Sequence, residues 1–173
     1  MKRITTFLII ALITVAASQS AMAQTLKFAH INNDELIRSM PEFDTAMAQL
    51  EKIRLQYVSD IELLQVEFNN AYNRYVTESG KWSDMVKQTK EEELGAMQQK
   101  IQDFQAQAQQ DMTDKQTTFF QPIIDKAAKA VKDVGRENGF IYVFDTSKGV
   151  VLFFDETKST DITTLVKAKL AIK

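Results

Sequence analysis

The sequence contains no cysteine, a single histidine and no large excess of charge of either sign. Without cysteine the chain has neither disulfides nor a thiol nucleophile, and with one histidine a structural zinc site is not expected. The 21 basic and 23 acidic residues are interspersed and give a net charge of −2, so the basic patch that nucleic-acid binding requires is missing. No Gly-x-Ser-x-Gly motif occurs either. We therefore predict neither an enzyme nor a cofactor.

Long apolar runs are also scarce, and the longest lies at the N-terminus. Residues 1–23 combine a basic start, about fourteen mostly apolar residues and an A-x-A pattern, which is typical of a signal peptide cleaved between Ala23 and Gln24. A membrane anchor is the alternative, but the run is shorter than the ~20 residues that a span needs. Cleavage would remove Lys2 and Arg3 and no acid, changing the net charge from −2 to −4. An exported chain without disulfides must hold its shape by packing or assembly.

The first part of the mature chain, residues 24–40, predicts a short strand and the start of a helix. Residues 26–31 favour the strand, and Asn32 or Asn33 can cap a helix by accepting a hydrogen bond from a free amide of the first turn. Pro41 favours the first turn of a new helix, which we expect to extend to about residue 77.

Residues 41–120 predict a hairpin of two long helices. Gly80 interrupts the helical pattern at a tip near 77–84, Ser83 or Asp84 can cap the second helix, and this helix begins near Met85. A helix of ~35 residues is about 50 Å long, more than the width of a domain of this size, so the hairpin must project. Steps of three and four residues define an apolar seam of Tyr57, Ile61, Leu64, Phe68, Ala71 and Tyr75 on one helix and Leu94, Met97, Ile101, Phe104 and Ala108 on the other, with a slip at Met112.

In residues 121–173 the sequence predicts the end of the second long helix, a β-hairpin and a C-terminal helix. Pro122 lacks an amide hydrogen and is expected to kink the helix near Thr118, which makes it a candidate hinge. The runs FIYVF and VVLFF predict strands at 140–145 and 150–154 around a TSKG turn. The last helix presents one apolar face of Ile162, Leu165, Val166 and Leu170.

Such apolar strands are typical of sheets buried on both faces, yet one chain offers few elements to cover them. Several copies pooling their strands would bury them and close the open sheet edges, so we predict an obligate oligomer. A monomer whose arm bends over the sheet is the alternative. The expected oligomer body includes Phe28, Ile31, Phe140, Tyr142, Phe144, Val151 and Phe153.

Two groups of side chains are candidates for function. Apolar residues off the seam can contact a partner by many weak, adaptable contacts: Leu55, Leu63, Val66 and Tyr72, with Trp82 and Met85 at the tip. Trp82 packing across the helix ends is the simpler interpretation. His30 is expected to be structural, and Asp145 and Asp155 more often serve turns than acid–base catalysis.

Three segments resemble a known family: KFAHINNDELIRSMPEF at 27–43, VGRENGFIYVFD at 134–145 and STDITTLVKAKL at 159–170. They look like the Skp (OmpH-type) periplasmic chaperones of Gram-negative bacteria, and the glutamine-rich return helix with QPII at 121–124 is similar to Bacteroidetes-like members. The resemblance implies an α+β, mostly α fold in a homotrimer. Its pooled strands form a β-barrel body and its helical arms enclose a cavity. It also implies an ATP-independent holdase for unfolded outer-membrane β-barrel proteins in the periplasm.

This chain departs from the family in its charge. Known members have strongly basic arms, whereas this chain is acidic overall and its arm mixes both signs, which puts binding of lipopolysaccharide or membrane surfaces in doubt. The alternative function is a structural or adaptor coiled coil of the envelope. A dedicated zipper would keep strict heptads, so the slip at Met112 and the Gly80 loop favour a flexible arm.

Overall fold

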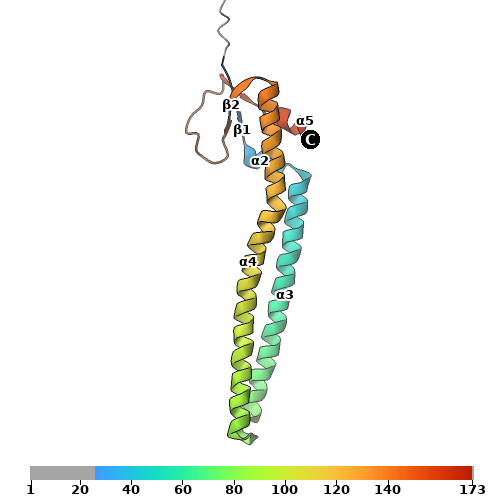
Figure 1. The fold of residues 1–173 in the computed structure, drawn as a ribbon, viewed down its shortest axis with the longest axis vertical. Helices are drawn as coiled ribbons and strands as arrows, with labels where there is room; N and C mark the ends of the chain where they lie inside the picture. Colours follow the sequence, from blue (N-terminus) through green and yellow to red (C-terminus); the bar gives the residue numbers. More distant parts are fainter. Residues whose placement is uncertain (1–25, 173) are drawn as a thin grey trace, which may run out of the picture.

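The computed structural model describes residues 26–172 and shows a long helical arm joined to a small body (Figure 1). The elements in chain order are β1 (Lys27–Ile31), α2 (Asn33–Arg38), α3 (Pro41–Glu78), the 3-10 turn η1 (Ser79–Lys81), α4 (Asp84–Glu137), β2 (Phe140–Asp145), β3 (Ser159–Asp161) and α5 (Thr163–Lys169). The predicted mostly α fold with a small β part is confirmed. The predicted cleavage site between Ala23 and Gln24 lies outside the described residues.

None of the described helices has both the length and the apolar composition needed to cross a membrane.

The arm consists of α3 and the first two thirds of α4, which lie antiparallel (Figure 1). The predicted seam residues of both helices are partly or fully buried between them. Two tyrosines also join the helices: the Tyr57 hydroxyl donates to Asp111 Oδ2 at 2.6 Å, and the Tyr75 hydroxyl donates to Glu91. With 54 residues, α4 is about 80 Å long. The expected projecting hairpin is therefore confirmed.

At Met112 the spacing of the inward side chains along α4 changes, but the apolar seam continues without a break. From Ile101 the inward side chains follow steps of three, four and four residues, so that Ile101, Met112 and Ile123 recur every eleven residues and all turn toward the neighbouring elements. Eleven residues in three turns correspond to 3.67 residues per turn, which removes the left-handed supercoil of a heptad seam.

Pro122 lies inside α4, which continues through it as one helix. The proline has no amide hydrogen, so the carbonyl of Thr118 receives no helical hydrogen bond from it. Figure 1 shows α4 changing direction in its yellow-to-orange part, where the arm meets the body. At this junction Phe120 packs on Phe43, with ring centroids 5.2 Å apart. That Pro122 acts as a hinge stays a prediction.

The body buries a small core between the sheet and helices α2, α4 and α5. Asn32 caps α2 as predicted, since its Oδ1 accepts a hydrogen bond from the Glu35 amide at 3.0 Å. Gly135 of α4 lies so close to β2 that a Cβ there would be 3.5 Å from Val143 Cγ2. The predicted apolar face of α5 is wrong at Leu165, which is exposed. The core comprises Ala29, Ile31, Leu36, Met40, Ala46, Ile123, Ala127, Ala130, Val134, Ile162 and Val166.

The sheet has the strand order β2-β1-β3, with both outer strands parallel to β1. The predicted β-hairpin is wrong: residues 147–149 do form a turn, but 150–154 are not a strand. The third strand is instead Ser159–Asp161, which pairs with Phe28–His30. Because β1 lies between β2 and β3, the thirteen residues 146–158 must cross from one side of the sheet to the other as a loop.

Candidate functional site

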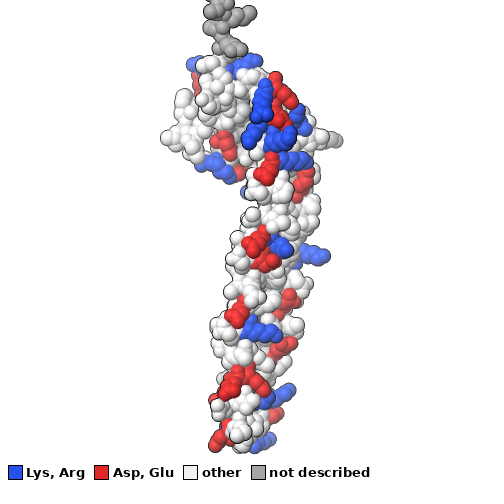
Figure 2. Space-filling model, in the orientation of Figure 1, with Lys and Arg blue, Asp and Glu red and all other residues white. Residues whose placement is uncertain are grey.

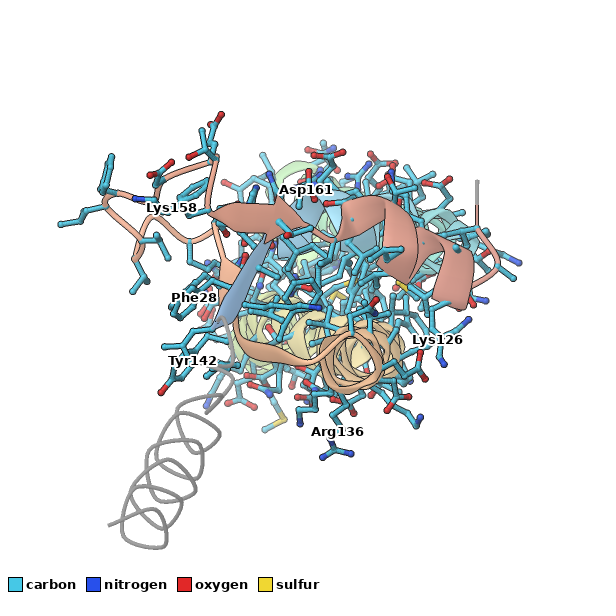
Figure 3. The ribbon with its side chains drawn as sticks, turned by 90° about the horizontal axis from the view of Figure 1, so that it is seen from above. Phe28, Lys126, Arg136, Tyr142, Lys158 and Asp161 are labelled. Atoms are coloured by element: carbon cyan, nitrogen blue, oxygen red, sulfur yellow. The ribbon has the colours of Figure 1, made fainter. Side chains whose placement is uncertain are left out.

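One face of the sheet carries the core, and the other carries exposed aromatic side chains. Alternation along β1 and β2 places Ala29 and Ile31 inward and Phe28, Tyr142 and Phe144 outward. The rings of Phe28 and Tyr142 stack with centroids 6.4 Å apart, and those of Tyr142 and Phe144 with centroids 5.9 Å apart. Figure 3 shows Phe28 and Tyr142 pointing away from α4. We call Phe28, Tyr142 and Phe144 the aromatic face: within the described part of one chain, Tyr142 and Phe144 are exposed and Phe28 is half-buried.

The loop 146–158 continues this apolar surface. Val150, Leu152 and Phe153 are 80%, 95% and 86% exposed, whereas Val151 is half-buried. Phe154 folds back onto His30, with ring centroids 4.4 Å apart. His30 Nδ1 also lies 2.9 Å from the Ser159 hydroxyl, so the histidine ties the loop and β3 to β1.

Most residues that the sequence suggested for an oligomer body therefore lie together. Phe28, Tyr142, Phe144 and Phe153 belong to the uncovered aromatic face or the loop beside it, and Phe140 is half-buried at the start of β2. Ile31 differs, because it is only 2% exposed and belongs to the chain's own core.

Asp145 and Asp155 shape turns and do not face one another across a hairpin. Asp145 Oδ1 accepts hydrogen bonds from the Asn33 amide at 3.3 Å and from the Ser147 amide at 2.8 Å. Asp155 Oδ1 accepts from both the amide and the hydroxyl of Thr157, and these bonds, with nearby Lys158, hold the pKa of Asp155 below its usual value. Within residues 26–172 no group of three acidic or histidine side chains could hold a metal ion.

The outward surfaces of the two arm helices differ in chemistry. On α3, seven large apolar side chains are exposed: Met47, Leu55, Val58, Leu63, Val66, Tyr72 and Val76. Over residues 87–123 of α4, all of which the structure describes, no large apolar side chain is exposed. The sequence identified four of the seven and missed Met47, Val58 and Val76, although Val58 and Val76 occupy the same heptad positions as the recognised Tyr72 and Leu55.

The outward surface of α4 carries hydrogen-bonded pairs of glutamine and acid four residues apart. The four bonds have lengths of 2.8 to 3.1 Å, and the first residues of the pairs recur every eleven positions. Because eleven residues make three turns, the pairs form one row along the helix. The spacing was visible in the sequence but was overlooked. The pairs are Gln88–Glu92, Gln99–Asp103, Gln110–Asp114 and Gln121–Asp125.

At the tip of the arm, Trp82 and Met85 have different environments. Trp82 is half-buried and packs edge-on against Tyr75 of α3, with ring centroids 6.0 Å apart, as in the simpler interpretation of this residue. Met85 is 80% exposed at the start of α4. Ser83 precedes α4 as its N-cap residue, although its side chain makes no capping bond.

Charges are distributed unevenly between arm and body. Figure 2 shows both signs scattered along the arm and basic side chains gathered where α4 ends in the body. In this region a groove of about 480 Å³ lies between α4 and β2. Lys132 and Arg136 line the groove and form no ion pair with any residue in 26–172, and Figure 3 shows Arg136 pointing outward from α4.

Comparison with known proteins identifies the family to which this fold belongs. The model of the OmpH-like outer membrane protein family matches residues 27–170. One similar structure is a crystal structure from Caulobacter crescentus CB15, described as an OmpH-like outer membrane chaperone. It matches with a TM-score of 0.72 and 14% sequence identity over 88% of each chain, so the two proteins share a fold. Among curated proteins, none matches the sequence. Because the family model covers most of the chain, from β1 to the end of α5, the protein belongs to the OmpH-like family.

Proposed function

We propose that the protein is an ATP-independent holdase of the periplasm, which keeps unfolded outer-membrane β-barrel proteins soluble until their insertion. The observation that carries this proposal is the set of seven exposed apolar side chains on α3, which no element within residues 26–172 covers although the arm is otherwise rich in charge. Soluble proteins keep such surfaces for binding. Contacts spread over a long arm are individually weak, which suits clients of many sequences.

The uncovered aromatic face supports an oligomeric body as part of the same proposal. Tyr142 is 60% exposed on a three-stranded sheet, and the loop beside it exposes Leu152 and Phe153 almost completely. Packing these surfaces together between copies of the chain removes apolar area from water, and each Å² removed is favourable by about 25 cal/mol. The arms of a small oligomer, a trimer by analogy with the family, would then project from one body and surround a client.

The experiment that tests the holdase function compares two matched variants of residues 24–173. The first carries Leu63→Gln, Val66→Gln and Tyr72→Gln on α3. The control carries Gln99→Ala, Gln102→Ala and Gln110→Ala on the outward surface of α4. An unfolded outer-membrane β-barrel protein is diluted from urea into each variant, and aggregation is followed by light scattering.

We expect the α3 variant to lose most of its ability to suppress aggregation, and the α4 variant to match the unchanged protein. Both should keep the same oligomeric mass and helical circular dichroism, since the changed side chains are exposed. Equal suppression by the two variants would show that α3 is not the client-binding surface. Failure of the unchanged protein to suppress aggregation would favour the envelope adaptor instead.

A further inference from the structure

A pocket lies where the arm joins the body, and the proposed client surface on α3 alone does not account for it. Its volume is about 570 Å³, which falls within the ~300–1,000 Å³ of ordinary ligand pockets. Three helices meet here, since α2 and the start of α3 lie near the part of α4 that changes direction (Figure 1). The apolar and basic side chains of this junction pocket are Ile37 and Arg38 of α2, Phe43 and Met47 of α3, and Phe120 and Ile124 of α4.

The apolar side chains of the junction pocket remain open to a ligand. Met47 is 48% exposed and Ile124 is 38% exposed, whereas Phe43 and Phe120 are half-buried and form a wall with their ring centroids 5.2 Å apart. In residues 87–137 of α4, all of which the structure describes, Ile124 is the only exposed large apolar residue. A side chain that enters a concave site is covered on several sides, so it gains more from burial there than on the convex surface of one helix.

Part of the exposed apolar surface of α3 leads into this pocket. Val58, Tyr72 and Val76 follow Met47 by 11, 25 and 29 residues, which places all three within about 20° of Met47 around a helix of 3.6 residues per turn. These four exposed residues form a stripe of about 44 Å along α3, and an extended chain of roughly 13 residues can follow it. The stripe ends in the pocket, because Met47 belongs to both.

A positive charge at the rim of the pocket limits which segments fit it best. The guanidinium carbon of Arg38 lies 5.7 Å from the centroid of the Phe43 ring, and Arg38 forms no ion pair within residues 26–172. Asp34, the acidic residue of the pocket, is paired with Lys148 at 2.7 Å. A guanidinium favours contact with aromatic rings, and its N–H groups can still donate to a carboxylate.

We propose that the junction pocket anchors an aromatic side chain of the client that stands beside a carboxylate. The ring packs among Phe43, Met47 and Ile124. The carboxylate accepts hydrogen bonds from Arg38, and the neighbouring client residues follow the stripe on α3. One strong anchor combined with several weak contacts gives affinity for a class of segments and not for a single sequence. This inference rests on the proposed holdase function, and it specifies the class of client segment that is held most strongly.

Three fluorescent peptides test the proposal against the assembled protein, residues 24–173. They share one soluble, unstructured sequence of serine, threonine and valine that is long enough to follow the stripe. They differ only in a pair of residues at one end, which is Phe–Asp, Ala–Asp or Phe–Asn. By fluorescence anisotropy we expect Phe–Asp to bind about tenfold more tightly than Ala–Asp, because the ring leaves water. We expect it to bind about threefold more tightly than Phe–Asn, because a partly exposed ion pair contributes little.

Three variants separate the parts of the site. Met47→Gln combined with Ile124→Gln should bind the Phe–Asp and Ala–Asp peptides about equally, whereas Arg38→Gln should keep the preference for phenylalanine and lose the preference for aspartate. Leu63→Gln changes an exposed residue on the opposite side of α3 from the stripe, so it should weaken all three peptides alike and keep both preferences. Circular dichroism and oligomeric mass should be unchanged, since every substituted side chain is exposed.

Photo-cross-linking locates the bound ring. A peptide in which benzoylphenylalanine replaces phenylalanine should label Met47 or another residue of the junction pocket, as identified by mass spectrometry. Labelling confined to the aromatic face or to the tip of the arm would overturn the proposal, and so would equal affinity for the three peptides. A change of oligomeric mass in the Met47→Gln, Ile124→Gln variant would also overturn it, because the pocket would then hold a second copy of the chain.

The outcome for the pocket is separable from the outcome for the holdase function. Selective, pocket-dependent binding of the Phe–Asp peptide by a protein that fails to suppress client aggregation would keep the pocket and refute the holdase. Suppression of aggregation by a protein with equal affinity for the three peptides would do the reverse.

Discussion

Replacing Leu36 by alanine measures how much the small body core contributes to stability. Leu36 lies in α2, is fully buried and contacts the core shared by α4 and α5. The substitution removes three carbon atoms, worth about 2.4 kcal/mol at ~0.8 kcal/mol per buried group. A residual cavity adds to this cost, so we expect a loss of about 3 kcal/mol within the usual range of ~2–5 kcal/mol. For a domain with a stability of ~5–15 kcal/mol, that loss is large.

Leu63→Ala is the matched control, because the same chemical change is made in a helix at a residue that is 59% exposed. We expect it to change the free energy of unfolding by less than about 0.5 kcal/mol. Both variants are unfolded in urea and followed by circular dichroism at one fixed protein concentration, since assembly makes stability depend on concentration. Equal costs for Leu36→Ala and Leu63→Ala would refute the assignment of the core to the body.

Two further predictions concern the arm. Hydrogen bonding of the Tyr57 hydroxyl to Asp111 raises the pKa of Tyr57 above its ordinary value of 10.0. The bond to the neutral tyrosine therefore stabilises the arm fully below pH 10.0, and this contribution is lost as the pH rises through the higher pKa of the folded protein. Ultraviolet titration of Asp111→Asn should show one tyrosine ionising at lower pH than in the unchanged protein, and identical curves would contradict the bond. Pro122→Ala restores the hydrogen bond to the Thr118 carbonyl and should straighten α4, giving a larger maximum dimension in small-angle X-ray scattering; an unchanged dimension would mean that packing of Phe43 on Phe120 sets the bend.

The helices could be predicted from the sequence because local signals determine them. Asn32 caps α2 and Pro41 starts α3, and both act within one turn of their own position. The apolar seam fixed the pairing of α3 with α4, because two long amphipathic helices joined by a short turn have few other ways to bury it. The expected length of these helices, which exceeds the width of a domain of this size, predicted that the arm projects.

The sheet could not be predicted in the same way, because its pairing is non-local. FIYVF and VVLFF looked like a hairpin since they are neighbours in sequence, but β2 pairs with β1 across more than one hundred residues. β3 has the polar sequence STD, which carries no strand pattern, and it forms because β1 supplies a partner and His30 reaches the Ser159 hydroxyl. Tertiary context decides the state of such short strands.

The candidate surfaces were predicted in part. Off-seam apolar residues such as Leu55 and Val66 were recognised, since a helical wheel is enough to place them outside. The contrast between α3 and α4 was missed, although the sequence shows that Gln99 and Gln110 each have an acid four residues on, within hydrogen-bonding reach on a helix. Trp82, a candidate contact residue at the tip, packs on Tyr75, in line with the simpler interpretation that the sequence favoured.

The central claim is tested most directly by native mass spectrometry of residues 24–173, alone and after an unfolded outer-membrane β-barrel protein is diluted from urea into the sample. The account predicts one defined small oligomer that gains a client molecule without changing its own subunit number. A monomer would contradict the shared body, and an oligomer that remains empty while the client precipitates would contradict the holdase.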